Sequence, residues 1–277
     1  MRTIKAGSLI TVIKDLCIKS AYNLPPAYMR MIKKAAKTQK GRAAGILDLI
    51  LKNAKTASKE FYPLCQDTGT AVLFIEIGRE VFIQGDINKA VEEGVRLGFK
   101  EGYLRKSIVS DPLFIRKNTA DNTPAVIHFS FTKGDKVKIK LILKGGGAEN
   151  TSKLKMFNPC DGKTEIISFI IDTVKAAGAK ACPPLVIGVG IGGNFEDCAL
   201  LAKKALLRSS KHKNKFYRRL EEEALSAVNK LNIGPQGLGG GTTALAVFAE
   251  YAPCHMASLP VAVNICCHSH RRAEAQL

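Results

Sequence analysis

The sequence predicts an α/β protein in which mixed sheet regions are flanked by helices, with a helical N-terminal part. Three observations predict this class. Apolar residues recur at helical spacing over residues 4–17 and 28–52. Short apolar runs bounded by turn residues follow, as is typical of strands. A strand, a glycine-rich turn and a helix then succeed one another over residues 185–207. With no repeat or linker in view, we expect one domain over residues 1–277, of which about the first 60 are mainly helical.

The first third of the chain contains helices followed by a loop and a strand. Residues 4–17 form a helix, and residues 28–52 continue helically. The loop CQDTGT (65–70) precedes an apolar strand over residues 71–77. Asp86 can cap the next helix, which we expect to run to about Arg105.

Two strands, residues 125–132 and 136–143, come next and are expected to pair through Lys133-Gly134-Asp135. Apolar residues alternate with lysines along the second strand, which indicates a half-buried strand whose outer face carries the lysines. This strand leads directly into the glycine-rich loop KGGGAEN (144–150).

The second half of the chain alternates helices, strands and glycine loops. We expect helices at 165–177 and 221–231 and a strand at 261–266. A proline turn, a short strand, a glycine loop and a helix fill residues 181–207, and a glycine loop feeds an apolar segment over 234–251. The glycine clusters lie at junctions between elements, where backbone can approach a ligand.

Composition and charge limit the classes of function. The apolar fraction of 46% indicates a folded chain, and no apolar run approaches the ~20 residues of a membrane-spanning helix. No signal peptide is evident, so we expect a cytoplasmic protein without a membrane partner. The net charge of +18 makes nucleic acid the first partner to consider. Because the basic residues form separate patches and no nucleic-acid motif appears, solvated surface and attraction of small acidic substrates compete with that reading.

The pattern Gly188-x-Gly190-x-x-Gly193 follows a strand and precedes a helix, as a dinucleotide-binding fingerprint requires. The acid expected about 20 residues later is missing, because the chain is basic there until Glu221. A nicotinamide enzyme therefore stands as one hypothesis. Close packing of a strand, a turn and a helix is the structural alternative.

Eight cysteines are present, and no two form a CxxC pair. In a reducing compartment these thiols are core residues, nucleophiles or metal ligands. Three of them, Cys65, Cys182 and Cys267, lie at comparable junctions. A four-iron cluster held by three thiols keeps one iron open, which Lewis-acid chemistry requires. Buried core thiols are the alternative, and Asp67 alone could be a turn residue.

Four blocks of the sequence together resemble the class I, iron–sulfur, oxygen-sensitive fumarate hydratase family, in particular the α subunits of its two-subunit fumarases and L-tartrate dehydratases. The resemblance extends from about Leu16 to the C-terminus, with the blocks in the family's order. These blocks are PLCQDTGTAVLFIEIG, KGGGAENTSKLKM, CPPLVIGVGIGGNFEDCALLAKKAL and PVAVNICCHSHRRAEA.

The resemblance implies a [4Fe–4S] cluster held by Cys65, Cys182 and Cys267. Cys267 is chosen over the adjacent Cys266 because it stands four residues before Arg271, where the family's cysteine falls before its arginine. His255, twelve residues before Cys267, supports the same register. The other thiols fall outside the ligand set: two are expected in the core, and two match no ligand position (Cys17 and Cys198; Cys160 and Cys254).

The resemblance also implies roles for polar residues. Gln66 and Asp67 look like substrate and acid–base residues, and Arg105 is placed to bind a substrate carboxylate. Gly145 and Gly146 would supply backbone contacts. His255 is the family's catalytic histidine and is expected to reach the neighbouring protomer, which implies a dimer of α subunits and an α2β2 assembly. The remaining histidines of the C-terminal block are expected to be surface or structural (His268 and His270).

The implied activity is the reversible dehydration of a hydroxy-dicarboxylate by one domain of the Fe–S hydro-lyase α type. We expect (S)-malate to fumarate first, with L-tartrate to oxaloacetate or a methylated fumarate as open alternatives. The family's remaining catalytic residues lie in a β part that nothing here matches. We therefore expect the chain to be inactive without its β subunit. A basic nucleic-acid-binding protein is the alternative from another class.

Overall fold

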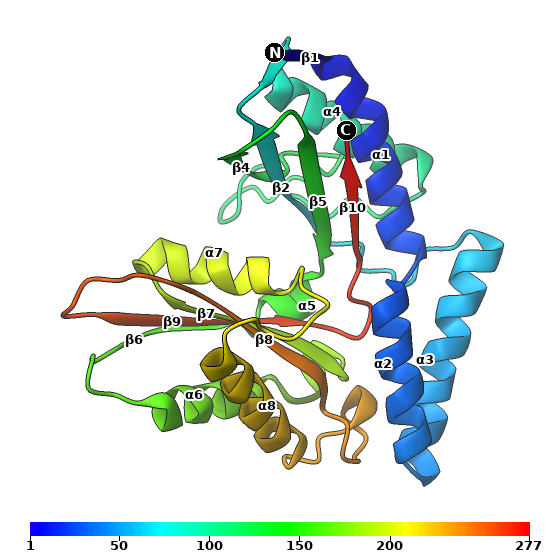
Figure 1. Cartoon of the computed structure of the whole chain (residues 1–277). Helices are drawn as coiled ribbons and strands as arrows, with labels where there is room; N and C mark the ends of the chain where they lie inside the picture. Colours follow the sequence, from blue (N-terminus) through cyan, green and yellow to red (C-terminus); the bar gives the residue numbers. More distant parts are fainter. The chain divides into compact units, whose positions relative to one another are not determined.

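The computed structural model describes residues 1–277 and confirms the mixed α/β class with a helical N-terminal region. The chain divides into two compact units. Unit 1 consists of residues 1–25, 53–146 and 269–277, and unit 2 of residues 26–52 and 147–268. Each unit contains one four-stranded sheet (Figure 1). The single domain expected over residues 1–277 stays a prediction.

Unit 1 is built on the sheet β10-β5-β2-β4. Strand β2 pairs parallel with β4 and antiparallel with β5, and β5 pairs antiparallel with β10. Two short strands, β1 and β3, form a separate parallel pair. The elements are β1 (Arg2–Lys5), α1 (Ala6–Tyr22), β2 (Thr70–Gly78), β3 (Val81–Gln84), α4 (Ile87–Glu101), β4 (Val126–Thr132), β5 (Val137–Lys144) and β10 (Arg272–Gln276).

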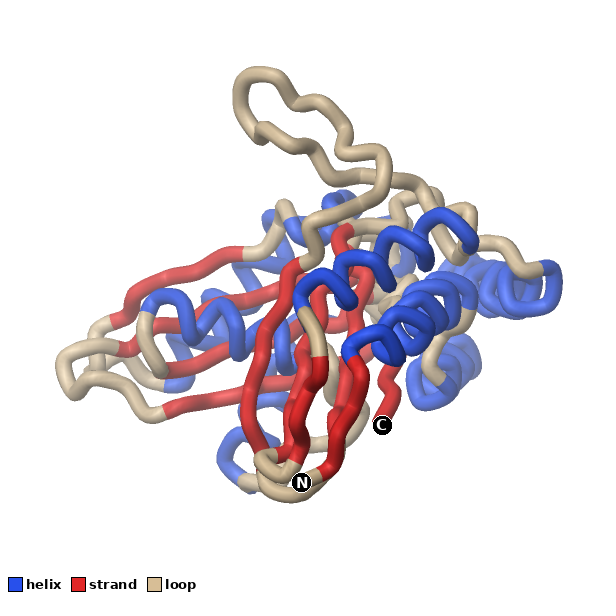
Figure 2. The backbone as a smooth tube through the Cα atoms, turned by 90° about the horizontal axis from the view of Figure 1, so that it is seen from above, coloured by secondary structure: helices blue, strands red, loops and turns tan.

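The core of unit 1 lies between this sheet and the helices α1 and α4, which lie next to the strands near the N-terminus (Figure 2). Alternate residues of β2 and β5 point into it, including Ile75 and Ile139. The two helices touch closely at Gly98, where a Cβ would lie 2.6 Å from the Cβ of Cys17. The predicted cap is also confirmed, because the Asp86 side chain accepts a hydrogen bond from Lys89 N.

The expected pairing of residues 125–132 with 136–143 is wrong. Strand β2 lies between these two strands and hydrogen-bonds to both, so β4 and β5 are not neighbours. The physical reason is burial: β2 is almost wholly apolar, and the central position of the sheet buries it on both edges. The lysine alternation along β5 is confirmed, since Lys136 and Lys138 are exposed while Val137 and Ile139 are buried.

Unit 2 is built on the sheet β6-β9-β7-β8, in which β7 pairs parallel with β8 and antiparallel with β9. Helices α6 and α8 pack on one face and α7 on the other (Figure 1). Its α-helices are α2 (Pro26–Thr38), α3 (Gly41–Glu60, which continues into unit 1), α5 (Gly146–Glu149), α6 (Lys163–Ala177), α7 (Phe195–Ala205) and α8 (Lys215–Asn229). Its strands are β6 (Lys153–Phe157), β7 (Leu185–Gly192), β8 (Ala244–Ala252) and β9 (Leu259–Cys266), and two 3-10 turns cover Gly178–Ala181 and Pro235–Gly237.

The glycine pattern at 188–193 is a packing feature. Gly188 and Gly190 lie inside β7, where the backbone of α7 approaches the strand. A Cβ at Gly190 would lie 1.9 Å from the carbonyl oxygen of Cys198, and one at Gly188 would lie 2.0 Å from that of Ala202. The structural alternative is therefore confirmed. These two glycines allow the backbone of α7 to pack directly on β7, and they do not form a phosphate-binding turn.

Several element boundaries differ from the sequence expectation. The helix expected over 28–52 is broken at Gln39 and Lys40, where Gly41 adopts a φ of 55°. Helix α4 ends at Glu101 because Gly102 caps it, rather than near Arg105. The glycine loop after β5 turns at once into the short helix α5. No helix is long and apolar enough to cross a membrane.

Replacing Gly190 by alanine is expected to lower the free energy of unfolding by about 3 kcal/mol, because an extra methyl must be forced into a packed contact with backbone. Gly45→Ala is the matched control. Gly45 lies within α3, and a Cβ added there would meet nothing within 4 Å, so alanine should raise stability by up to about 1 kcal/mol. Urea unfolding measures both, and equal stability of the two variants would contradict the packing.

Candidate functional site

The loop over residues 65–69 lies against the end of β5 in unit 1. Gly69 has a φ of 78°, and a Cβ there would lie 2.3 Å from the carbonyl oxygen of Lys144. Both the conformation and the lack of space require glycine. The next residue, Thr70, starts β2 directly opposite Lys144. The loop that carries Cys65, Gln66 and Asp67 is thereby fixed beside the turn at Gly145.

Two of the predicted residues, Arg105 and Gly145, lie next to the Asp67 carboxylate. Arg105 Nη2 lies 3.5 Å from Asp67 Oδ1. Gly145 is packed so closely that a Cβ would lie 2.9 Å from Asp67 Oδ2. Asp67 is half-buried and Arg105 is exposed. Gln66 is also exposed, and its Oε1 accepts a hydrogen bond from the Cys65 thiol at 3.4 Å. Gly146 is exposed, with open space around it.

The segment that carries Arg105 is held on the loop by two further residues. Thr68 Oγ1 donates to the carbonyl oxygen of Arg105 at 2.5 Å. Asn122 is fully buried; its Nδ2 donates to the Gly69 carbonyl at 3.2 Å, and its Oδ1 accepts from Ser107 N at 2.7 Å. Asn122 has a φ of 67°. Sequence reasoning missed this residue, because nothing local distinguishes it from a turn asparagine.

In unit 2 the structure brings the Cys182 and Cys267 segments together. Cys182 follows the 3-10 turn at 178–181 with a φ of 52°, and its carbonyl oxygen accepts from the backbone N–H of His268 at 3.2 Å. The proline turn after it is fixed as well. Gln236 donates to the Pro183 carbonyl through its backbone N–H at 2.8 Å and through Nε2 at 2.9 Å. The two thiol-bearing residues therefore sit on neighbouring, well-held backbone.

Tyr28 of α2 reaches the same place. Its hydroxyl donates to the carbonyl of Pro184 at 3.3 Å. Burial raises the pKa of Tyr28 well above its usual value, and the neighbouring thiols of Cys266 and Cys267 act in the same direction. Cys266 is buried as the last residue of β9, whereas Cys267 is half-buried beyond it. The choice of Cys267 as ligand stays a prediction.

His255 does not join these residues within unit 2. It lies in the exposed turn between β8 and β9, while Cys267 follows the other end of β9. An eight-residue strand spans about 25 Å, so the whole length of the sheet separates the two. Its ring Nδ1 accepts from Ala257 N at 3.1 Å. Within unit 2, His255 and Cys267 therefore lie at opposite ends of β9, and the catalytic role expected for His255 stays a prediction.

Apart from His255, the predicted site residues of each unit lie at one end of its sheet. In unit 1 they lie where β2 begins and β5 ends, with Thr70 opposite Lys144. In unit 2 they lie where β7 begins and β9 ends, with Val186 opposite Cys266. Neither unit by itself contains three or more histidine, cysteine or acidic side chains grouped as a metal site.

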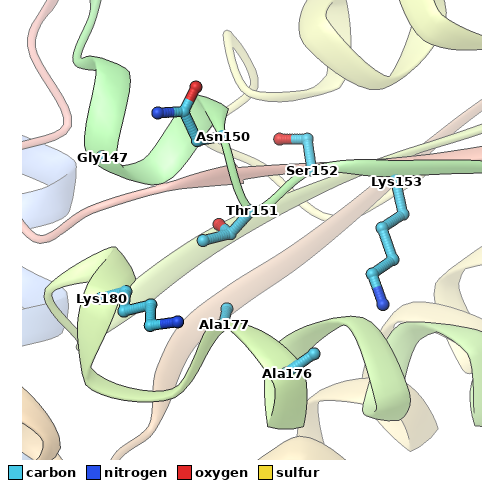
Figure 3. A pocket seen from close by; sticks show the side chains of 8 residues that line it. All are labelled: Gly147, Asn150, Thr151, Ser152, Lys153, Ala176, Ala177 and Lys180. Carbon is cyan, nitrogen blue, oxygen red and sulfur yellow. The ribbon is translucent and has the colours of Figure 1, made fainter.

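An open pocket of about 450 Å³ adjoins this end of the sheet in unit 2. Figure 3 shows the side chains of Lys153 and Lys180 on either side of two alanines at the end of α6. Lys180 stands two residues before Cys182. The pocket therefore adds positive charge near the cysteine segment, which favours the approach of anions.

The other cysteines follow the sequence expectation for core thiols. Cys17 and Cys198 are fully buried, which confirms them as core residues. Burial raises the pKa of Cys17 to about 12 and also raises that of Cys198. Cys160 and Cys254 are exposed. Of the remaining histidines, His270 is buried, so the surface position considered for it is wrong.

Comparison with known proteins identifies the family. Residues 10–276 match the family model described as "Fumerase: Fumarate hydratase (Fumerase)". The chain therefore belongs to the class I fumarate hydratase family, a family of hydro-lyases, and the resemblance inferred from the four sequence blocks is confirmed.

Within this family the chain is homologous to α subunits of L(+)-tartrate dehydratase. A protein of Methanocaldococcus jannaschii named "Putative L(+)-tartrate dehydratase subunit alpha" is 40% identical over 272 residues, which cover 95% of both chains. The L(+)-tartrate dehydratase subunit alpha of Escherichia coli (strain K12) is 30% identical over 248 residues, which cover 88% of this chain and 81% of that one. The protein of the same name from Shigella sonnei has the same identity and coverage.

Alkylation of the native chain at pH 8 should separate core thiols from surface thiols. The thiolate is the reacting form, and a pKa of about 12 leaves Cys17 almost entirely protonated at that pH. Iodoacetamide should modify Cys160 and Cys254, while Cys17 and Cys198 react only after denaturation. Peptide mass spectrometry measures this, and labelling of Cys17 in the folded protein would contradict its assignment to the core.

Proposed function

We propose that this chain is the α subunit of a two-subunit [4Fe–4S] hydro-lyase that reversibly dehydrates a hydroxy-dicarboxylate. Family membership and the α-subunit names of the relatives support it. The observation that carries it is the arrangement around Asp67: a carboxylate between Arg105 and Gly145, two residues after Cys65. Such an arrangement offers an acid–base group and an anion-binding group side by side.

Cys65, Cys182 and Cys267 are the proposed cluster ligands. Their chemistry fits, because thiolates are the usual ligands of iron–sulfur clusters. The hydrogen bond between the Cys182 carbonyl and His268 N brings two of the three segments together, and Cys65 is only partly buried on its loop. When bound, a cluster with three protein ligands supplies an iron with an open position, a Lewis acid toward the substrate hydroxyl.

The chain's own residues would handle the proton and the charge. Elimination of water from malate requires removal of a weakly acidic C–H proton, and the adjacent carboxylate gains enediolate character as the proton leaves. Asp67 is the proposed acid–base residue. The Arg105 guanidinium and the backbone at Gly145 and Gly146 bind the carboxylate on which charge develops. Gln66, exposed beside Cys65, is proposed to orient the substrate.

The substrate we propose first is (S)-malate, converted to fumarate, as the description of the family model favours. A second candidate is L-tartrate, converted to oxaloacetate. The observation in its favour is that the curated relatives are named as L(+)-tartrate dehydratase subunits. Malate and tartrate differ by one hydroxyl group, so assays on both with the same preparation decide between them.

A β subunit is the proposed partner, since the relatives carry the name "subunit alpha". We also propose a dimer of α subunits, giving an α2β2 assembly in which His255 serves the neighbouring protomer. The exposed turn at 253–258 and its distance from Cys267 along β9 support this. Purified under anaerobic conditions, the isolated α chain should have little activity. Co-expression with the β subunit should restore turnover of malate or tartrate.

Single replacements of Cys65, Cys182 and Cys267 by serine should each lower the iron bound and the visible iron–sulfur absorbance of the anaerobic protein, because hydroxyl is a poor substitute for thiolate. Cys254→Ser is the matched control and should retain full absorbance, since that thiol is exposed and donates only to the Ser258 carbonyl. Cys266→Ser tests the register. A greater loss of iron from this variant than from Cys267→Ser would overturn the choice of Cys267.

Asp67→Asn should lower kcat of the α–β enzyme by about 100-fold or more, because the amide has nearly the same shape but cannot accept a proton. Iron content and absorbance should remain those of the wild type, which separates a loss of chemistry from a loss of cluster. Near-normal turnover with an intact cluster would rule out the role assigned to Asp67.

A further inference from the structure

A buried arginine lies behind the Asp67 loop, and the proposed function does not yet use it. Arg271 is only 2% exposed and is among the largest fully buried side chains of the protein. Its backbone is fixed at the start of β10, because its carbonyl oxygen accepts from Leu143 N at 2.9 Å. The side chain comes from residues 269–277 and reaches back to the loop that precedes β2, within unit 1.

The guanidinium group of Arg271 is only partly satisfied. Its Nη1 donates to the main-chain carbonyl of Asp67, and its Nε is buried without a hydrogen-bond partner. It makes no ion pair, and the Asp67 carboxylate pairs with Arg105 instead. Burying a charge that lacks a counterion is costly. A buried, unpaired arginine therefore indicates that positive charge at this position serves a function that offsets its cost in stability.

The charges of these three side chains do not balance. Two guanidinium groups, Arg105 and Arg271, face one carboxylate, Asp67. Gly145 lies between them: the position of a Cβ on this residue is 2.9 Å from Asp67 Oδ2 and 3.1 Å from Arg271 Nη2. One positive charge is therefore left over beside the backbone that the proposed function assigns to a substrate carboxylate.

We propose that Arg271 is a positioning residue that sets the affinity of this site for the carboxylate end of a dicarboxylate. It acts without touching the substrate. Its Nη1 holds the Asp67 carbonyl in place beside Gly145, and its uncompensated charge favours an anion next to them. This inference rests on the proposed function and extends it to a residue that serves affinity rather than proton transfer.

The test uses the anaerobic α–β enzyme with Arg271→Gln and Arg271→Lys. Glutamine removes the charge, so KM should rise about tenfold while kcat changes less than about threefold, the signature of lost uniform binding. Lysine keeps the charge, and its KM should stay within about threefold of wild type. The dissociation constant of succinate, an unreactive dicarboxylate measured by calorimetry, should change in parallel with KM.

Arg208→Gln is the matched control. Arg208 is another largely buried arginine, paired with Glu221 at 2.6 Å in unit 2. Its loss should lower the melting temperature but leave KM and succinate binding unchanged. A purely structural Arg271 would behave in the same way. Unchanged KM and succinate affinity in folded Arg271→Gln would therefore overturn the proposal, as would equal losses in the lysine and glutamine variants.

Gly145→Ala covers the case in which Arg271→Gln does not fold. The added methyl would separate Asp67 from Arg271 without removing either charge, so KM should again rise about tenfold. A normal KM in this variant would overturn the inference. If the wild-type α–β enzyme turns over neither malate nor tartrate, the proposed function fails first. If the enzyme turns over malate or tartrate but KM does not change when Arg271 is replaced, only the role of Arg271 is refuted.

Discussion

The contact between Gly69 and the Lys144 carbonyl is the constraint on which the rest of the site in unit 1 depends. It fits only a residue without a side chain, in a conformation with positive φ. Because this contact fixes the loop, the Asp67 carboxylate faces Gly145 and the Asn122 side chain can join the loop to the Arg105 segment. Without this contact, the Asp67 carboxylate would not be held in a fixed position relative to Arg105 and Arg271.

The two sheets repeat one pairing pattern. In each, a central strand pairs parallel with an edge strand and antiparallel with a third strand, whose other edge is covered antiparallel: β2, β4, β5 and β10 in unit 1, and β7, β8, β9 and β6 in unit 2. Apart from His255, the predicted site residues occupy the same place in both, at the start of the central strand and the end of its antiparallel neighbour. The predicted site residues thus lie on loops that are held in place by paired strands.

Local pattern predicted the α/β class, the buried strands and the core thiols Cys17 and Cys198, because burial imposes a period on neighbouring residues. The roles predicted for Asp67 and the motif glycines came from the family resemblance, because residue type alone left Asp67 open as a turn residue. Strand order could not be predicted, since the insertion of β2 between β4 and β5 depends on partners distant in sequence. Arg271, Asn122 and Tyr28 were missed for the same reason: each acts through a contact with a far segment.

The discontinuity of unit 1 also has a consequence for biosynthesis. Its sheet needs β10, whose residues are made only after the whole of unit 2. Pairings between such distant segments form slowly, because the intervening chain must first be ordered. While unit 2 is being synthesised, the rest of unit 1 is therefore present without β10, and the outer edge of β5 remains unpaired. The Asp67 loop receives its buried arginine only in the last step, so a competent site is a late product of folding.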